Sequence, residues 1–262
     1  PSTRRWQIHD KYREEDAGAL TMNVVVMIPA RLAATRLPNK PLVDIAGKPM
    51  VQWVYEKSLA SRADAVFIVT PDDEIAALAH GFNAPVIMTS HAHQTGTDRL
   101  AEAVASLPES VDIIVNVQGD EPRITADAIN SVITPLLEDS ELAMSTLACK
   151  LPDDRFDDPN TVKVVLKRNG DALYFSRAGI PFPRSLSTVA PLQHVGLYAY
   201  RRSFLSTFPT LERTPLEQTE SLEQLRALEH GYRIRVVHTS HVPESVDTAE
   251  DLERVRALFS EE

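Results

Sequence analysis

The chain has 262 residues, of which 43% are hydrophobic and 24% are charged, and its formal net charge is -10. This composition is typical of a globular protein that forms one large α/β domain or two small ones. The acidic balance argues against non-specific binding to nucleic acid or to an anionic membrane, so an anionic ligand needs a local cationic pocket. The single cysteine, Cys149, excludes an internal disulfide framework and suits a reducing compartment. It follows the apolar run 142–148, which predicts a buried, inert thiol.

The first 21 residues are polar and charged, and they lack the apolar core of a secretory signal. Met22 stands directly before the first apolar run of the chain. We therefore expect residues 1–21 to be a poorly ordered N-terminal extension and residues 22–262 to form a single domain. No apolar run approaches the length of a membrane span, so no membrane partner is expected.

Residues 24–28 are consecutive apolar residues, which predicts a buried strand of a parallel sheet that ends at Pro29. Two prolines in the following loop forbid a regular helix there. The loop carries three cations, Arg31, Arg36 and Lys40, at the end of the strand where open α/β sheets bind ligands. Arginine offers a planar fork and lysine a point charge, so together they can hold a polyphosphate. Solvated surface cations are the alternative explanation.

Strands and helices alternate over the next hundred residues, which favours parallel βαβ units. Thr70 is predicted to cap a helix with Pro71 at its first position. The expected elements are a turn at 47–49, a helix at 50–59, a strand at 65–69, a helix ending at 79, a strand at 85–88, a loop at 91–99 leading to a helix that ends at 107, a strand at 112–117 and a helix at 125–137.

The second half is less regular. Residues 161–167 and 172–176 flank an Asn-Gly turn, which is a strong hairpin signal. Thr214, Pro215 and Glu217 form a capping-box pattern for a helix that is expected to end at Gly231. Further elements are a strand at 193–200, a strand at 233–237 and a helix at 249–259. The predicted fold class is α/β, with a mixed, mainly parallel sheet flanked by helices and a hairpin-containing insert that covers a site or forms a dimer contact.

Asp120 follows another buried strand, within residues 118–122. Gly119 beside it lets the backbone approach a ligand closely. Hard cations prefer carboxylate oxygens, so Asp120 is a candidate ligand for a Mg²⁺ ion shared with substrate phosphates. The alternative is an ordinary turn acid.

The loop at 95–99 supplies hydroxyls, a flexible backbone and a cation at an expected helix start, a combination that can bind the edge of a base. An ordinary N-cap explains the same residues equally well. His91 and His93 have the spacing of a metal pair, but the sequence offers no third ligand nearby, and solvated loop histidines are the preferred interpretation.

Six ordered motifs then point to a family. They are IPARxxxTRLPxKPL at 28–42, GKPM at 47–50, TGTDR at 95–99, NVQGDEP at 116–122, HVGLY at 194–198 and ESLEQLR at 220–226. From Met22 to Leu258 the chain closely resembles the 3-deoxy-manno-octulosonate cytidylyltransferases, also called CMP-Kdo synthetases. The family often has glycine where this chain has Asn39, and asparagine tolerates left-handed backbone angles better than most residues.

The resemblance implies a Rossmann-like nucleotidyltransferase fold and a homodimer. It also implies the reaction of CTP with 3-deoxy-D-manno-octulosonate (Kdo) to give CMP-Kdo and pyrophosphate, with Mg²⁺ as the cofactor. The expected setting is the cytoplasm of a Gram-negative bacterium, where the product feeds lipopolysaccharide biosynthesis. Neither nucleic acid nor a membrane is an expected partner.

The resemblance also assigns roles to individual residues. Those implied as catalytic are Arg31, Lys40, Asp120 and Asp247, the two aspartates being the implied metal ligands. Those implied to bind the nucleotide are Pro29, Ala30, Arg31, Lys40, Thr95, Gly96, Thr97, Arg99 and Gln118. Those implied on the sugar side are Gln118, Arg177, His194, Tyr198, Glu220, Ser221 and Gln224.

Asp247 has a second explanation. It precedes the closing helix and is followed three residues later by Glu250, which is a capping-box-like pattern. Two rival functions also stay open: a cytidylyltransferase for another acidic sugar such as a sialic acid, and a non-catalytic nucleotide-binding module. A dinucleotide oxidoreductase is disfavoured because the first βα turn lacks the required glycines.

Overall fold

The computed structural model describes residues 23–33, 36–93, 95–185 and 189–260. The expectations for residues 1–21, for Met22 as the start of the domain and for Thr35 of the first motif lie outside this range. The described strands are β1 (Asn23–Pro29), β2 (Asp44–Ile45), β3 (Lys48–Pro49), β4 (Ala65–Thr70), β5 (Val86–Met88), β6 (Val111–Asn116), β7 (Met144–Lys150), β8 (Lys163–Leu166), β9 (Ala172–Ser176), β10 (Leu192–Arg201) and β11 (Ile234–His238). The described α-helices are α1 (Met50–Leu59), α2 (Asp73–Gly81), α3 (Gly96–Val104), α4 (Ala126–Glu138), α5 (Arg202–Thr207), α6 (Pro215–Glu220), α7 (Gln224–Glu229) and α8 (Ala249–Ser260).

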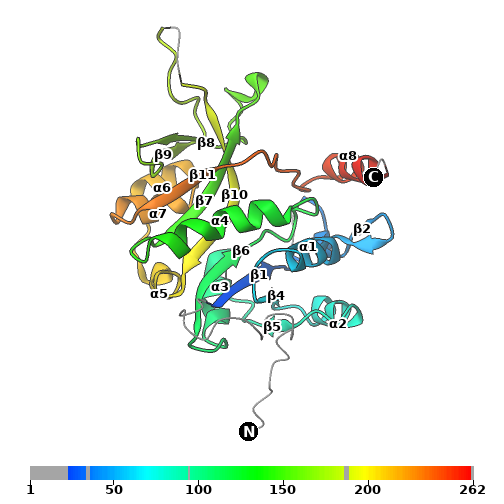
Figure 1. The fold of residues 1–262 in the computed structure, drawn as a ribbon. Helices are drawn as coiled ribbons and strands as arrows, with labels where there is room; N and C mark the ends of the chain where they lie inside the picture. The colour runs from blue at the N-terminus through cyan, green and yellow to red at the C-terminus, as the bar shows by residue number, and fades with distance from the viewer. Residues whose placement is uncertain (1–22, 34–35, 94, 186–188, 261–262) are drawn as a thin grey trace.

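One large sheet organises the described part of the chain (Figure 1). Its strand order is β11-β7-β10-β6-β1-β4-β5, and the β8–β9 hairpin is attached at β10. Strands β6, β1, β4 and β5 pair in parallel, and so do β11 and β7, whereas β10 runs antiparallel between β6 and β7. The α/β fold class with a mixed, mainly parallel sheet is therefore confirmed.

Strand β1 is buried on both faces because helices cover both sides of the sheet. Val26 and Ile28 belong to one core with α1 and α4, and Met27 belongs to a second core with α3 and α7. All three side chains are fully buried. The unbroken apolar run that predicted this strand follows directly from that double burial.

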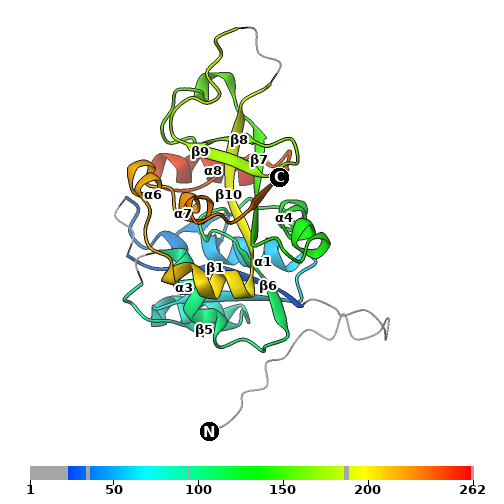
Figure 2. The ribbon, with the colours of Figure 1, turned by 90° about the vertical axis from the view of Figure 1, so that its left-hand side faces the viewer.

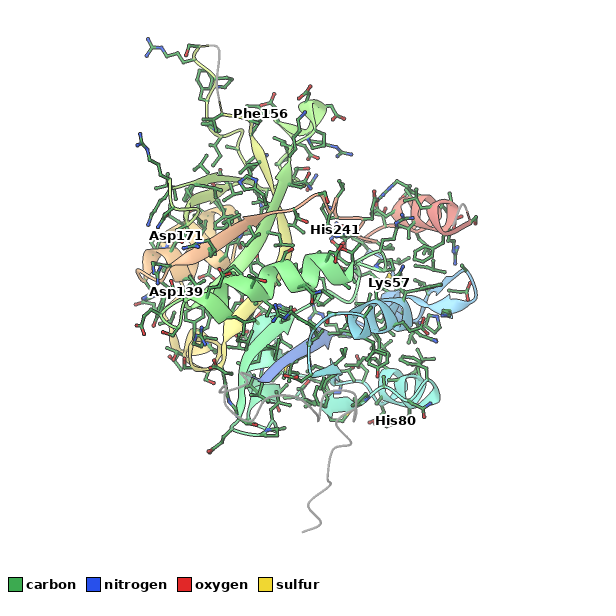
Figure 3. All side chains as sticks on the ribbon, viewed as in Figure 1. Lys57, His80, Asp139, Phe156, Asp171 and His241 are labelled. Atoms are coloured by element: carbon green, nitrogen blue, oxygen red, sulfur yellow. The ribbon has the colours of Figure 1, made fainter. Side chains whose placement is uncertain are left out.

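A hairpin insert projects from one end of the molecule (Figure 2). The predicted β8–β9 hairpin is confirmed, with Gly170 of its turn at φ 87°. Asp171 beside that turn accepts a hydrogen bond from Arg235 Nε of β11 at 2.8 Å, and Phe156 lies in the projecting part (Figure 3). At the base, buried Lys163 donates to the carbonyls of Asp158, Thr161 and Arg177 at 2.9, 2.6 and 2.6 Å. The Asp171–Arg235 bond links the hairpin to β11, and the Lys163 bonds join the segments before β8 and after β9.

Two helix predictions were wrong in detail. Thr70 is the last residue of β4 and pairs with Met88, so the helix begins after Asp72 instead of at Pro71. The helix predicted from Thr214 to Gly231 keeps its capping box but is broken into α6 and α7. The break lies at Ser221, whose φ of 51° is left-handed. The Leu222 N–H bonds back to the Glu217 carbonyl at 3.2 Å and closes α6.

Two longer elements, and the two-residue strands β2 and β3, were not predicted. The apolar run 142–148, to which the sequence assigned no element, lies mostly in β7, and α5 was missed. Cys149 of β7 is buried as predicted, and burial raises the pKa of its thiol. Within the described residues, every helix is too short or too polar to cross a membrane.

Candidate functional site

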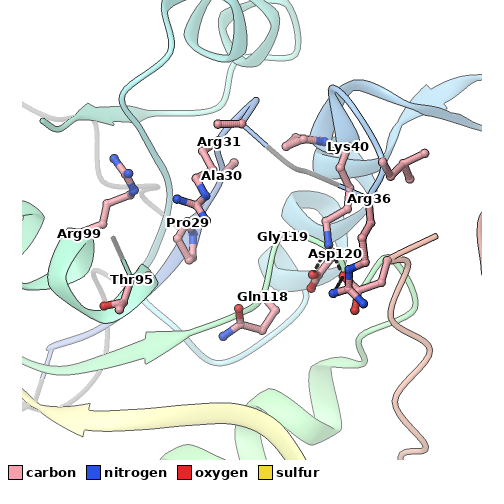
Figure 4. Close-up of a pocket in the computed structure, with 15 residues that line it drawn as sticks. Pro29, Ala30, Arg31, Arg36, Lys40, Thr95, Arg99, Gln118, Gly119 and Asp120 are labelled. Atoms are coloured by element: carbon pink, nitrogen blue, oxygen red, sulfur yellow. Dashed lines mark hydrogen bonds and ion pairs between the residues drawn. The ribbon is translucent and has the colours of Figure 1, made fainter. Parts of the chain in front are cut away.

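A cleft of about 380 Å³ opens at the carboxyl ends of β1 and β6 (Figure 4). Its walls are the loop after β1, the start of α3, the turn after β6 and Asp247 from the segment before α8. The sequence-predicted residues that line it are Pro29, Ala30, Arg31, Arg36, Lys40, Thr95, Gly96, Arg99, Gln118, Gly119, Asp120 and Asp247.

The loop after β1 contains a 3-10 turn that sets the direction of Lys40. The turn runs over Lys40–Leu42 with Pro41 in its first positions, and the preceding Asn39 has a left-handed backbone with φ 55°. Asparagine tolerates this left-handed backbone better than most other residues do.

Lys40 lies between two carboxylates that come from distant parts of the chain. Its Nζ is 2.6 Å from Asp120 Oδ2 and 2.9 Å from Asp247 Oδ1. Arg36 Nη2 approaches the same Asp247 oxygen at 3.2 Å. Burial lowers the pKa of Lys40, but the charges and hydrogen bonds of the two aspartates outweigh it and raise the pKa above its ordinary value. Lys40 therefore stays charged at neutral pH.

Asp247 does not cap α8. The Asp251 N–H donates to Thr248 Oγ1 at 3.2 Å, and the Thr248 N–H donates to Asp251 Oδ2 at 3.1 Å, which is a reciprocal capping arrangement. The capping explanation for Asp247 is therefore wrong, and so is the expected pattern with Glu250. Its side chain turns towards Lys40 instead. The Val246 N–H fixes this segment by donating to the Asp120 carbonyl at 2.9 Å.

Gly119 permits a close approach of two strand ends. A Cβ at this position would lie 2.8 Å from the Pro29 carbonyl oxygen, which is too close for any side chain. The expected role of Gly119 was to let a ligand approach the backbone, whereas its missing side chain leaves room for the Pro29 carbonyl of β1. Next to the aspartates, Glu121 has its pKa raised to about 8 by burial and by the charges of Asp120 and Asp247, so this carboxyl is mostly protonated at pH 7.

The predicted base-binding residues lie at the start of α3, and only some of them line the cleft. Thr95 caps the helix, because its Oγ1 accepts from the Asp98 N–H at 3.1 Å, and it also lines the cleft with Gly96. Arg99 is almost fully buried, donates to Thr89 Oγ1 at 2.6 Å and reaches the cleft wall. Burial and the nearby Arg31 charge lower its pKa. Thr97, in contrast, turns away from the cleft.

The loop histidines contact carboxylates. His93 Nε2 pairs with Glu102, and His91 Nδ1 lies 4.0 Å from Asp72 Oδ1. No group of three or more His, Cys, Asp or Glu side chains that could hold a metal is found among the described residues.

Of the residues implied on the sugar side, Gln118 alone lines this cleft within the described part of the chain. Several of the others bind one another. The Glu220 carboxylate accepts from Ser176 Oγ at 2.7 Å and from the Arg177 N–H at 2.9 Å. Arg177 Nε donates to the Glu220 carbonyl at 2.7 Å, and its Nη2 reaches the Ser221 carbonyl at 3.4 Å. These contacts join β9 to the turn between α6 and α7.

The other implied sugar residues lie on β10 and α7. His194 is buried, and burial lowers the pKa of its imidazole to about 3, so the ring is neutral. Its Nε2 lies 2.9 Å from Thr146 Oγ1, which itself lies 2.9 Å from the Leu197 carbonyl. The Thr146 hydroxyl also lies 3.1 Å from the Val195 carbonyl, so this hydroxyl joins the His194 ring to the backbone of β10. The Tyr198 ring lies beside the His194 ring in a tilted arrangement, with centroids 5.4 Å apart, and Gln224 is buried at the start of α7.

Two acidic residues near the site were missed. Glu121 was quoted only as part of the NVQGDEP motif, and Glu223 only as part of ESLEQLR. Glu223 Oε2 accepts a hydrogen bond from Thr97 Oγ1 at 2.5 Å. The motif spacing was a usable signal for both, but the contact across 126 residues was not visible in the sequence.

Comparison with known proteins adds a family to this geometry. A family model described as "Cytidylyltransferase" matches residues 25–234. A protein of Syntrophotalea carbinolica named 3-deoxy-manno-octulosonate cytidylyltransferase is 50% identical over 247 residues, covering 90% of this chain and 98% of that protein. One of the same name from Francisella tularensis subsp. novicida is 47% identical over 247 residues, covering 91% and 99%.

Solved structures agree with the fold. A CMP:2-keto-3-deoxy-manno-octonic acid synthetase complexed with CTP superimposes with a TM-score of 0.88 at 41% identity, covering 91% of this chain and 99% of that one. The 4-diphosphocytidyl-2C-methyl-D-erythritol synthase of Anaerococcus prevotii has a TM-score of 0.64 at 14% identity over 91% and 96% of the chains. At that identity the second likeness concerns the fold alone.

Proposed function

The chain belongs to the cytidylyltransferase family, among the 3-deoxy-manno-octulosonate cytidylyltransferases, and we propose that its cleft holds CTP for transfer to that sugar acid. The reaction is CTP + Kdo → CMP-Kdo + pyrophosphate, which activates Kdo for lipopolysaccharide biosynthesis. CTP is a cytoplasmic nucleotide, so we place the enzyme in the cytoplasm. The observation that carries the proposal is the convergence of Lys40, Asp120 and Asp247 in a cleft that also contains Arg31.

The donor set of the cleft suits a magnesium ion. Asp120 and Asp247 both direct carboxylate oxygens at one cationic group, and hard divalent cations prefer such ligands. Two protein carboxylates match the usual magnesium site, in which substrate phosphates and water complete the coordination. We propose that these aspartates hold Mg²⁺, which when bound offsets phosphate charge and makes the attacking hydroxyl more acidic.

The protein residues position the substrates and neutralise charge. We assign Arg31 and Lys40 to the triphosphate, because both are cations of the loop after β1. Thr95, Gly96 and Arg99 lie at the start of α3, where backbone N–H groups and a buried guanidinium can bind the cytosine edge. The anomeric hydroxyl of Kdo attacks the α-phosphorus in line, the bond to pyrophosphate breaks, and the hydroxyl proton passes to solvent.

We place the sugar acid on the β10 side of the cleft. Gln118 is at its border, with Nε2 donating to Asn116 Oδ1 at 3.4 Å. Neutral His194 can form a hydrogen bond with a sugar hydroxyl, but it supplies no positive charge for the carboxylate. Arg177 is the cation on this side, alongside Glu220 and Ser221.

One assay tests the reaction and the metal together. We expect pyrophosphate release with CTP, Mg²⁺ and Kdo, and little release when a sialic acid replaces Kdo. Excess EDTA should abolish turnover, and added Mg²⁺ should restore it. CTP binding without pyrophosphate release would indicate a non-catalytic nucleotide-binding module. Full turnover in EDTA would contradict the metal assignment, and turnover with sialic acid would change the substrate.

We also propose a homodimer that uses the hairpin insert. The insert exposes apolar side chains that a monomer leaves in water: Phe182 is 80% exposed, Val189 is 61% exposed and Leu173 is 54% exposed. Light scattering is expected to give about twice the 29.1 kDa chain mass. Phe182→Asp should shift the mass towards the monomer, whereas Val242→Asp, which changes an apolar residue of the loop after β11, should not. A wild-type mass of one chain at working concentration would refute the dimer.

A further inference from the structure

Glu223 connects two parts of the chain that the proposed function assigns to different substrates. It lies between α6 and α7, directly before Gln224 and two residues after the left-handed Ser221. Its Oε2 accepts from Thr97 Oγ1 at 2.5 Å, and Thr97 lies in the first turn of α3. That same turn brings Thr95 and Gly96 to the cleft wall.

The contact between Thr97 and Glu223 is partly buried. Burial raises the pKa of Glu223, and the hydroxyls of Thr97 and Thr95 only partly oppose that shift. Its Oε1 faces Arg226 Nη2 at 4.0 Å, and Arg226 is already fixed by Glu217 at 2.6 Å. Arg226 is buried together with Glu217, so its position is fixed. Glu223 therefore faces a fixed charge of α7 as well as the Thr97 hydroxyl of α3.

The link continues into the sheet. The Tyr200 hydroxyl is hydrogen-bonded to Thr97 and to Asn116, which join α3 to β10 and β6. Tyr198, on the same strand, stacks on Tyr200 with ring centroids 5.8 Å apart. Burial raises the pKa of both tyrosines, and the charge of Glu223 adds to this shift. α3 and α7 also share one core with Leu100 and Leu225, so the contact joins elements that already pack together.

We propose that Glu223 is a positioning residue that couples the nucleotide side and the sugar side of the cleft through Thr97. This rests on the proposed function, because it takes Thr95 and Gly96 as nucleotide-binding and Glu220, Ser221 and Gln224 as sugar-binding. When the sugar binds, it orders the turn between α6 and α7, and the Glu223–Thr97 bond then orders the first turn of α3. When the nucleotide binds, it orders the first turn of α3, and the same bond orders the turn between α6 and α7. Binding of one substrate therefore strengthens binding of the other by the same factor.

The coupling is measured with CMP and Kdo, which cannot react because no pyrophosphate can leave. Calorimetry gives the CMP dissociation constant with and without saturating Kdo, and the Kdo constant with and without CMP. For the wild-type chain we expect each ligand to tighten the other by about 5-fold or more, which is within the usual range for coupled sites. In Glu223→Ala, each ligand should tighten the binding of the other by less than about 2-fold, so most of the coupling free energy should be lost.

Variants of both partners test whether the hydrogen bond carries the effect. Thr97→Val should lose the coupling as Glu223→Ala does, and the double variant should lose no more than either single one. Glu223→Gln and Thr97→Ser keep an acceptor and a donor, so they should keep the coupling. Glu229→Ala is the matched control, because Glu229 is an exposed acid of α7 that accepts from the Leu216 N–H at 3.1 Å and does not reach α3.

The outcomes separate this inference from the proposed function. If CMP and Kdo both bind the wild-type chain independently, or if Glu223→Ala keeps the full coupling factor, the positioning role is wrong while the enzyme assignment stands. A loss of melting temperature with unchanged coupling would show that Glu223 is a purely structural tie. If neither ligand binds and no pyrophosphate is released from CTP, the proposed function fails and this inference fails with it.

Discussion

Replacing Asp247 by asparagine should lower turnover by about 100-fold or more, the scale seen when an electrostatic stabiliser of a transition state is removed. Asparagine is nearly the same shape but is neutral, so it is a much weaker ligand for Mg²⁺. The fold should persist, because the Thr248–Asp251 pair caps α8. The measurement is pyrophosphate release across a Mg²⁺ titration, together with a thermal melt.

The neighbouring cap supplies the matched control. Thr248→Ala removes the hydroxyl that accepts from the Asp251 N–H, so it should cost about 1 kcal/mol of stability and leave turnover near normal at a temperature where the chain is folded. Asp247→Asn should therefore lower turnover without lowering stability, and Thr248→Ala should lower stability without lowering turnover. Near-wild-type turnover of Asp247→Asn at limiting Mg²⁺ would eliminate Asp247 as a metal ligand.

The sequence predicted best those elements whose burial is set by the sheet itself. Val26 and Met27 point to opposite faces and both are fully buried, so the apolar run of β1 has one reasonable explanation. β7 was harder, because Ser145 and Thr146 interrupt its apolar pattern. Both are fully buried, and their hydroxyls bond to the carbonyls of Val132 and Leu197, partners far along the chain.

The errors in the helices also came from tertiary contacts. Nothing local marks Ser221 as a left-handed residue, so the capping box at Thr214 and the leucines beyond it predicted one continuous helix. Thr70 has the residue type of an N-cap, but its backbone pairs with β5. Asp72, which follows, accepts from the Leu32 N–H at 2.8 Å and so fixes the loop after β1.

The site, too, could be predicted only in part from the sequence. The motifs predicted which loops form the cleft, because the carboxyl ends of parallel strands meet at one edge of a sheet. They did not predict the direction of each side chain. Thr95 and Thr97 are two residues apart at the start of α3, yet Thr95 lines the cleft, whereas Thr97 bonds to Glu223 and does not line it. Likewise Asp247 was the candidate for the cap of α8, but Thr248 caps that helix and the Asp247 side chain contacts Lys40, 207 residues away.

Replacing Lys40 by methionine should have two opposite effects on ligand binding. The Nζ of Lys40 lies between Asp120 and Asp247, so in the absence of nucleotide it competes with a divalent cation for their oxygens. Removing the charge should strengthen binding of the metal alone by about 10-fold, which corresponds to about 1.4 kcal/mol. It should also reduce kcat/KM for CTP by about 100-fold, because the triphosphate loses a partly buried cation.

Mn²⁺ binding followed by electron paramagnetic resonance, with and without CTP, measures the first effect, and pyrophosphate release measures the second. Arg31→Met is the informative comparison: Arg31 lines the cleft, but Lys40 is the cation that bridges the two aspartates, so this variant should impair CTP use without strengthening Mn²⁺ binding. Lys48→Met removes a cation that pairs with Glu56 at 2.6 Å and does not line the cleft, and it should change neither. Equal losses of melting temperature and activity in Lys40→Met, with unchanged Mn²⁺ affinity, would mean that Lys40 holds the two aspartates together as a structural ion pair and does not bind the triphosphate.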